Sequence, residues 1–270
     1  MDRLKDKVAC ITGAGSGIGR ATALRFASEG ACVLVTDLRG DAAQSVVQEI
    51  EAAGGQALAM QVDVAREDQL AAMIALMVSH FGRIDILYNN AVNTSGKGKA
   101  DKDFLAFDTE RFFDVVRVNV LGGVLASKMA IPHMLRQGGG SILFTSSTSS
   151  LGGDVAQFSY GGSKAMVNWY VQTIAATFGK QGIRCNAILP GVIQTPAQQA
   201  WANAEMDAAF LDLHNVPRLG LPEDIASLAL FLASDESAYI NGTLMRSDGG
   251  MSCTVPYVQV VRNLLKPKEA

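Results

Sequence analysis

The sequence lacks the features that mark membrane-spanning, secreted and nucleic-acid-binding proteins. No uninterrupted apolar run approaches the ~20 residues that cross a bilayer, and the opening "MDRLKDKVACITG" holds no apolar stretch of the signal-peptide kind. The net charge of −3 argues against nucleic acid or an anionic membrane as a partner. We therefore expect a cytoplasmic protein that binds neither, and we interpret the basic cluster of Lys97, Lys99 and Lys102 as a solvated loop.

Cysteine and histidine are scarce as well. The four cysteines show no CxxC spacing, and Cys10, Cys32 and Cys185 lie in apolar runs where a thiol packs as a small hydrophobe. His80 and His133 lie in helical runs with no acidic or cysteine partner at ligand spacing. This usage suits a reducing compartment, and we predict no metal site.

Apolar residues, by contrast, are plentiful and regularly arranged. They make up 49% of the 270 residues, and short apolar runs alternate with longer runs of helical periodicity. The predicted strands are 7–12, 32–37, 56–63, 84–89, 141–146, 183–189 and 242–247, and the predicted helices are 17–29, 41–53, 67–81, 108–136, 160–179 and 222–233. This alternation predicts one α/β domain over 1–270, with a Rossmann-like, doubly wound parallel sheet of about seven strands and helices on both faces.

A glycine-rich loop follows the first predicted strand. In "TGAGSGIGRA", Gly13, Gly17 and Gly19 precede a helix, where glycine allows a tight turn and the close approach of a pyrophosphate to the helix amino terminus. Asp37 ends the second predicted strand, at a position where a carboxylate accepts hydrogen bonds from ribose hydroxyls. Together these features predict a dinucleotide site.

The stretch "FSYGGSKAM" opens a long predicted helix with two glycines, although glycine is a poor helix former. Tyr160 and Lys164 stand four residues apart and therefore share one face of that helix. Alone, this spacing is typical of an ordinary amphipathic turn. A Ser147 at the end of the fifth predicted strand and the glycine loop favour a catalytic interpretation.

With these motifs in this order, the chain resembles the short-chain dehydrogenase/reductase family over nearly its whole length. The matching segments are "TGAGSGIG" (12–19), "DV" (63–64), "NNA" (89–91), Asn119 in "VRVNVLGG", Ser147, "YGGSK" (160–164), "PG" (190–191) with Thr195, and "DGG" (248–250). Two departures stand out: Val92 replaces the usual glycine, and the extension 251–270 is longer than the usual ending.

The resemblance implies a catalytic set of Asn119, Ser147, Tyr160 and Lys164. Tyr160 would move the hydroxyl proton, Lys164 would lower the pKa of Tyr160 and bind the nicotinamide ribose, Ser147 would hold the substrate oxygen, and Asn119 would help to place a water that relays protons. Gly161 and Gly162 would keep the helix start slim. The implied cofactor-binding residues are Gly13, Ser16, Gly17, Ile18, Gly19, Asp37, Asp63, Val64, Asn90, Ala91, Tyr160, Lys164, Pro190, Gly191, Ile193 and Thr195.

The choice of cofactor depends on Asp37. Its carboxylate would repel the 2′-phosphate of NADP, and the glycine loop carries Ser16 where NADP-preferring relatives often have a basic residue. Arg39, two residues on, could offset that repulsion. We predict NAD.

The segment 192–216 after "PG" covers the active site in the family and is the predicted substrate lid. It offers Val192, Ile193, Trp201, Met206, Phe210 and Leu211 as an apolar wall at spacings compatible with a helix. Neither the lid nor the facing segment 148–158 contains Lys or Arg, although the basic cluster could supply a cation by folding inward, and His214 is a further candidate for substrate contact. We predict a neutral, apolar, ring-bearing secondary alcohol or ketone, such as a steroid, terpenoid or aryl carbinol.

Two alternatives remain open. One is an NADPH-dependent reductase of 3-oxoacyl thioesters, against which Asp37 argues. The other is a non-catalytic dinucleotide-binding sensor, which has no need of the tyrosine and lysine. The resemblance also implies a homotetramer in which helices 108–136 and 160–179 pair, with the extension 251–270 reaching a neighbouring subunit or closing over its own site.

Overall fold

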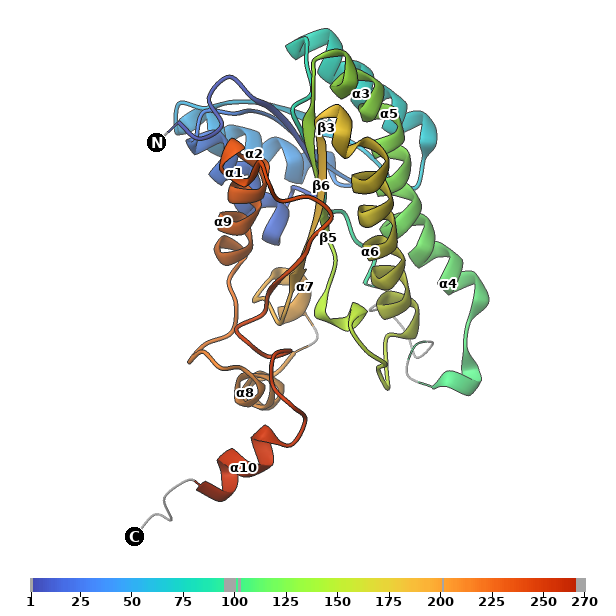
Figure 1. The fold of residues 1–270 in the computed structure, drawn as a ribbon, viewed down its shortest axis with the longest axis vertical. Helices are drawn as coiled ribbons and strands as arrows, with labels where there is room; N and C mark the ends of the chain where they lie inside the picture. The colour runs from blue at the N-terminus through green and yellow to red at the C-terminus, as the bar shows by residue number, and fades with distance from the viewer. Residues whose placement is uncertain (1, 95–100, 102, 201, 266–270) are drawn as a thin grey trace.

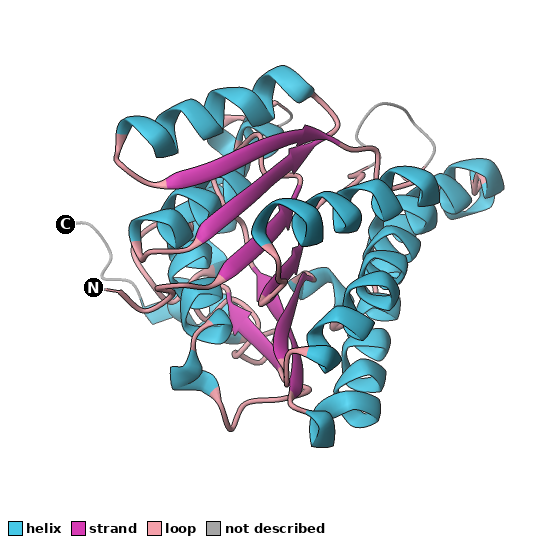
Figure 2. Ribbon diagram, turned by 90° about the horizontal axis from the view of Figure 1, so that it is seen from above, coloured by secondary structure: helices cyan, strands magenta, loops and turns pink. Residues whose placement is uncertain are grey.

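A parallel sheet of seven strands forms the middle layer of the molecule (Figures 1 and 2). The computed structural model describes residues 2–94, 101, 103–200 and 202–265. The strands are β1 (Val8–Thr12), β2 (Cys32–Asp37), β3 (Gln56–Gln61), β4 (Ile86–Asn89), β5 (Gly140–Thr145), β6 (Ile183–Pro190) and β7 (Leu244–Ser247). Their order is β3-β2-β1-β4-β5-β6-β7, and every neighbouring pair is parallel, so the predicted doubly wound sheet is confirmed.

Helices cover both faces of this sheet. The helices are α1 (Gly17–Ser28), α2 (Gly40–Ala52), α3 (Glu67–Phe81), α4 (Thr109–Val116), α5 (Gly123–Arg136), α6 (Phe158–Phe178), α7 (Pro196–Gln199), α8 (Ala204–Leu213), α9 (Pro222–Ala233) and α10 (Val258–Leu265). Figure 1 shows α1, α2 and α9 on one side of the sheet and α3, α5 and α6 on the other. The six predicted helices are present, whereas α10 has no counterpart among them.

The two faces of the sheet are buried in separate hydrophobic clusters. Successive side chains of a strand point to opposite faces, so Val8 and Cys10 of β1 join the cluster under α3, α5 and α6, and Ala9 and Ile11 join the cluster under α1, α2 and α9. Burial on both sides explains why the strands are continuous apolar runs.

The predicted helix 108–136 is a continuous helical rod with a change of pitch in its middle. Between α4 and α5, Arg117–Gly122 form a π-helical turn. By length and hydropathy the rod Thr109–Arg136 is one that could cross a membrane. Its inner residues Ala126, Ala130 and Met134 are fully buried in the core cluster beneath α3 and α6, as expected of the core helix of a globular domain.

The carboxyl ends of the strands set the location of the site. The chain order reverses between β1 and β4, and ligands of such sheets bind outside the strand ends at this reversal. The loops after β1, β4, β5 and β6 therefore meet at one edge.

Candidate active site

Glycines allow the loop after β1 to pack closely against neighbouring backbone. Gly13 has φ +64°, and a Cβ there would lie 2.8 Å from the Cα of Ala91. A Cβ on Gly19 would collide with the carbonyl oxygen of Gly13. Ser16 occupies the N-cap position of α1 in an extended conformation, and within the described chain its hydroxyl does not cap the helix. The helix amino terminus thus fits a pyrophosphate without a competing side chain.

Asp37 stands at the end of β2 beside this loop. One carboxylate oxygen accepts a hydrogen bond from the Gly15 N–H at 2.9 Å, and the other accepts one from the Arg39 N–H at 3.0 Å. The side chain is 12% exposed, while the Arg39 guanidinium lies 3.8 Å away and is mostly in solvent. The two hydrogen bonds therefore hold the carboxylate in one orientation at the end of β2.

The loop after β3 lies against the π-helical turn. Asp63 accepts a hydrogen bond from the Ala65 N–H at 2.9 Å, which tightens the turn. A Cβ on Gly122 would lie 2.9 Å from the Val64 carbonyl oxygen, so only glycine permits this approach. Asp63 and Val64 are therefore held together after the carboxyl end of β3.

Asn90 joins three strand ends. Its amide nitrogen donates to the carbonyls of Thr12 at 3.2 Å and Gly13 at 3.1 Å, and its amide oxygen accepts from the Thr145 hydroxyl at 2.9 Å. The Thr12 hydroxyl accepts the N–H groups of Asn90 and Ala91, both at 3.1 Å. Sequence reasoning missed Thr12 and Thr145, because a threonine at the end of a buried strand carries no signal of its own.

Lys164 is the most deeply buried charged side chain of the site. It is 2% exposed, and its ammonium donates to the Thr145 carbonyl at 2.7 Å. The Nζ atom lies over the Tyr160 ring, 5.6 Å from its centroid. Burial lowers the pKa of Lys164 to about 7, because the charged form loses its hydration.

Tyr160 differs from the expectation in the direction of its pKa. The sequence argument has Lys164 lowering the pKa of Tyr160, whereas burial raises it, opposed by a hydrogen bond between the Tyr160 and Ser147 hydroxyls. The reason is geometric and electrostatic: the ammonium is hydrogen-bonded to Thr145 and lies beside the ring, and its own charge is disfavoured by burial. The structure thus holds Tyr160 in its protonated form.

Asn119 holds two segments together within the π-helical turn. Its amide oxygen accepts the Asn93 N–H at 2.7 Å, and its amide nitrogen donates to the Asn93 carbonyl at 3.1 Å and the Ser163 hydroxyl at 3.0 Å. The side chain therefore ties the loop after β4 to α6 beside Tyr160 and Lys164.

The start of α6 is held by a residue distant in sequence. Asp101 is buried and accepts hydrogen bonds from the Ser159 N–H at 3.4 Å and the Ser159 hydroxyl at 3.0 Å. Of the two glycines expected to keep this turn slim, Gly161 has the Ser149 carbonyl 3.2 Å from where a Cβ would stand, whereas Gly162 faces open space. Only Gly161 meets a close neighbour.

The segment after β6 closes over the glycine loop. A Cβ on Gly191, which follows Pro190, would lie 2.9 Å from the Asp248 Cα, and the Thr195 methyl lies 3.2 Å from where a Gly17 Cβ would stand. The Thr195 hydroxyl also caps α7. Ile193 and Ile18 both contact the hydrophobic cluster beneath α1 and α9, so their side chains contribute to packing.

The predicted lid contains α7 and α8, and no residue of α8 is buried. Trp201 and the cluster Lys97, Lys99 and Lys102 lie outside the described residues. His214 is buried at the end of the lid, where its Nδ1 lies 2.6 Å from the Phe210 carbonyl. With Val192, Arg218, Asp224 and Asp248, among others, it lines a cavity of about 360 Å³ between the exits of β6 and β7.

Comparisons with known proteins agree with this architecture. The family model described as Enoyl-(Acyl carrier protein) reductase matches residues 13–252. The chain is 38% identical over 256 residues to 7alpha-hydroxysteroid dehydrogenase of Clostridium sardiniense, covering 95% of this chain and 97% of that one. It is also 38% identical over 251 residues to the 3-oxoacyl-(acyl-carrier-protein) reductase of Thermotoga maritima, covering 92% and 99%.

A solved structure is similar over the same extent. It is a 7 alpha-hydroxysteroid dehydrogenase complexed with NADH and 7-oxo glycochenodeoxycholic acid, with a TM-score of 0.88 and 38% identity, covering 92% of this chain and 95% of that one.

Proposed function

Because this chain belongs to the short-chain dehydrogenase/reductase family, we propose that it interconverts an apolar, ring-bearing secondary alcohol, of the hydroxysteroid class, and its ketone with NAD. One observation carries this proposal: the same edge of the sheet holds the Asp37 carboxylate, the uncapped amino terminus of α1 and the Ser147–Tyr160 pair. The relatives named as hydroxysteroid dehydrogenases support the substrate class, and the NADH complex of one of them supports the cofactor.

The cofactor supplies the hydride when the ketone is reduced and accepts it when the alcohol is oxidised. In reduction, the Tyr160 hydroxyl donates its proton to the substrate oxygen, and the raised pKa keeps that proton in place until it is needed. Ser147, hydrogen-bonded to Tyr160, holds the same oxygen. In oxidation the proton travels the other way, from the substrate hydroxyl to the Tyr160 oxygen, while the Lys164 side chain lies beside the ring.

The other residues predicted for the site have supporting roles in this proposal. Asn119 keeps α6 and the loop after β4 in register. Thr195, Gly191 and Pro190 close the nicotinamide end, and Asp63, Val64, Asn90 and Ala91 shape the adenosine end. The apolar residues of the lid contact the substrate rings.

An NADPH-dependent 3-oxoacyl-thioester reductase is the second candidate, favoured by the Thermotoga maritima relative. Against it stand the Asp37 carboxylate, which would face a 2′-phosphate, and the absence of Lys and Arg from 192–216 and 148–158. A phosphate-bearing thioester binds best where a guanidinium or ammonium can pair with it.

One panel of substrates separates the two candidates. The purified protein is mixed with NADH or NADPH and a 7-oxo bile acid, a neutral cyclic ketone or an acetoacetyl thioester, and NADH or NADPH absorbance is followed. We expect the highest kcat/KM for a ring-bearing ketone with NADH. A higher kcat/KM for the acetoacetyl thioester with NADPH would overturn the proposal in favour of the second candidate.

The assembly and compartment belong to the same proposal. The outward faces of α4 and α6 leave Phe113 and Trp169 exposed, as a pairing surface in a homotetramer requires. Cys10 and Cys185 are buried free thiols, which suits a reducing cytoplasm. Light-scattering mass measurement tests the tetramer.

A further inference from the structure

The end of the lid and the C-terminal extension are joined by polar contacts around Asn215. The Asn215 N–H donates to the Gly249 carbonyl at 2.8 Å, and its side-chain amide donates to the Gly250 carbonyl at 2.7 Å. From the other side, the Arg262 guanidinium of α10 donates to the Asn215 amide oxygen and, at 3.5 Å, to the His214 carbonyl. Residues 214–216, here called the hinge, are thus enclosed by the turn after β7 and by α10.

The turn after β7 is shaped to accept the hinge. Gly249 and Gly250 have φ of +60° and +79°, respectively. A Cβ on Gly249 would lie 2.7 Å from the His214 ring, and a Cβ on Gly250 would lie 2.6 Å from the Asn215 amide nitrogen. Asp248 holds the turn by accepting the N–H groups of Gly250 at 2.9 Å and of Ser252 at 3.0 Å. Since Asp248 also lies against Gly191, one rigid turn contacts both ends of the lid segment.

Packing alone does not fix α8 or α10. No residue of α8 and no residue of α10 is buried, and the apolar Val260, Leu264 and Leu265 of α10 are exposed. Figure 1 shows α10 outside the body of the molecule, beyond α8. The position of such helices is set by their polar contacts, because little apolar area is removed from water.

We propose that Arg262 is a positioning residue for the lid: through Asn215 and the His214 carbonyl it holds the hinge, and with it α8, in place for substrate binding. Arg262 touches neither cofactor nor reacting atoms in this scheme, so it acts on the binding of the substrate and leaves the proton and hydride steps alone. The substrate part of this inference rests on the proposed function, whereas the restraint of the lid does not.

Two measurements on Arg262→Ala test the proposal. Hydrogen exchange followed by mass spectrometry should show the α8 amides exchanging at least about threefold faster than in the wild type, with α3 amides unchanged. The KM for a 7-oxo bile acid should rise about three- to tenfold, as expected for loss of a charge-assisted hydrogen bond in a partly exposed place. The Kd for NADH, measured by fluorescence, should stay within about twofold.

Controls separate this role from a general effect of charge. Arg136→Ala, which removes the same charge from the end of α5, should change neither the exchange of α8 nor KM. Arg262→Lys keeps a donor for one carbonyl and should fall between wild type and Arg262→Ala. In a double-mutant cycle, adding Arg262→Ala to Asn215→Ala should accelerate α8 exchange less than it does in the wild type, because the two residues act through one contact.

The outcomes are distinguishable from those of the proposed function. Unchanged exchange of α8 in Arg262→Ala overturns the positioning role, whatever the substrate is. Faster exchange of α8 with an unchanged KM for a turned-over bile acid overturns it as well, since a loosened lid would then not affect binding. If the wild type turns over no ring-bearing ketone, the proposed function fails, and the exchange experiment still decides whether Arg262 holds the lid.

Discussion

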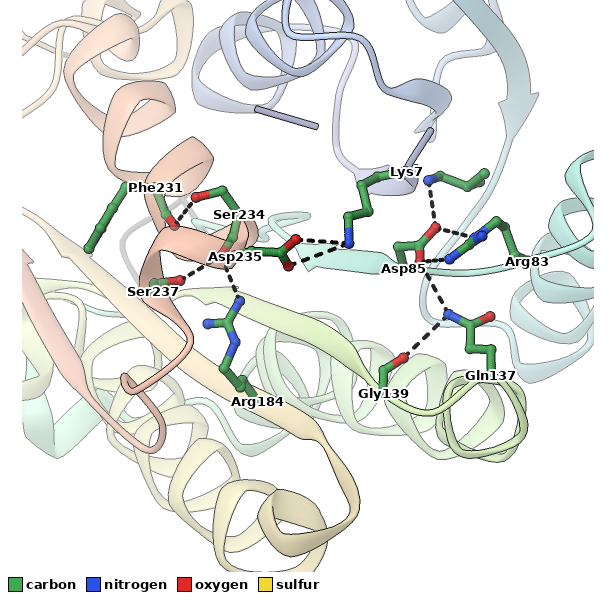
Figure 3. Close-up of polar contacts among 11 residues, drawn as sticks. Lys7, Arg83, Asp85, Gln137, Gly139, Arg184, Phe231, Ser234, Asp235 and Ser237 are labelled. Atoms are coloured by element: carbon green, nitrogen blue, oxygen red, sulfur yellow. Dashed lines mark hydrogen bonds and ion pairs between the residues drawn. The ribbon is translucent and has the colours of Figure 1, made fainter. Parts of the chain in front are cut away.

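The two edges of the sheet use buried polar groups in opposite ways. At the amino edge, Asp85 is as buried as Ser147 but has a full set of partners: the Arg83 guanidinium through two bonds of 2.7 Å and the Val8 N–H at 2.9 Å (Figure 3). At the carboxyl edge, Lys164 is more deeply buried, and its hydrogen-bond acceptor is a neutral carbonyl. Asp85 is thus paired with an opposite charge, whereas Lys164 forms no ion pair with any residue that the structure describes.

The same contrast extends to the neighbours of these groups. Lys7 pairs with Asp235, and the Arg184 guanidinium donates to the Ser234 carbonyl at 3.1 Å (Figure 3). These contacts link the starts of β1 and β6 to the residues that follow α9. At the carboxyl edge, burial shifts the pKa of both Lys164 and Tyr160 toward their neutral forms. Structural groups such as Arg83 and Arg184 also have shifted pKa values, so the shift points to chemistry only where the group lies at a candidate active site, as Lys164 and Tyr160 do. Four substitutions test this division.

The largest effect is expected at the carboxyl edge from Tyr160→Phe. The ring still packs but no proton can be transferred, so kcat should fall by about a thousandfold or more, near the upper part of what general acid catalysis contributes. Steady-state kinetics measure this, with NADH affinity staying within a few-fold. Tyr170→Phe on the same helix is the control and should retain full activity. A Tyr160→Phe rate above a tenth of wild type contradicts the assignment.

The next effect concerns Asp37. A 2′-phosphate beside this carboxylate meets a repulsion of about 4 kcal/mol per charge pair at 4 Å and an effective dielectric constant of 20. Discounted for screening, this still corresponds to a preference for NAD of about a hundredfold. Asp37→Ala should abolish most of that preference, seen as the ratio of kcat/KM for NAD and NADP, while Glu51→Ala at the far end of α2 leaves it unchanged. If the ratio of kcat/KM for NAD and NADP is unaltered in Asp37→Ala, a residue other than Asp37 discriminates between the two cofactors.

At the amino edge, Asp85→Ala should reduce stability and spare catalysis. The change leaves the Val8 N–H without its acceptor and the Arg83 guanidinium without its partner, which costs about 2–3 kcal/mol in the free energy of unfolding. Urea denaturation measures the loss, and kcat of the folded protein should be unchanged. Asp235→Ala is the matched control: its side chain is 85% exposed, and the change should cost less than about 0.5 kcal/mol. Equal losses of unfolding free energy in Asp85→Ala and Asp235→Ala would contradict the structural role given to the buried Asp85.

The smallest effect is a dependence of stability on pH. Lys164 has a pKa of about 7 when folded and an ordinary value of 10.5 when unfolded, so between these values the unfolded chain binds the additional proton. The free energy of unfolding then rises as pH increases, and the cost of the buried charge is greatest below pH 7. Urea denaturation at pH 7, 8 and 9 should show wild type gaining about 1 kcal/mol per pH unit relative to Lys164→Met. If the free energies of unfolding of wild type and Lys164→Met change with pH in parallel, burial does not lower the pKa of Lys164.

Local pattern predicted the elements of this fold closely. The strand 32–37 and the helices 67–81 and 222–233 were predicted with the bounds that the structure shows, because each depends on the periodicity of its own apolar residues. The helix 108–136 was predicted as one element, but its π-helical turn was not, because apolar spacing does not distinguish a local change of pitch. No helix was predicted in the extension 251–270, which contains α10.

The sequence alone was sufficient to identify the glycine loop, Asp37 and the shared helix face of Tyr160 and Lys164, because each of these is a pattern within a short stretch of chain. It could not identify the Thr12–Asn90–Thr145 links, the Asp101 contact with Ser159 or the Arg262 contact with Asn215, since each joins segments far apart in the chain. The pKa directions of Tyr160 and Lys164 also depended on the tertiary structure. Burial and the direction of one hydrogen bond decide them, and neither exists until the strands and helices have packed together.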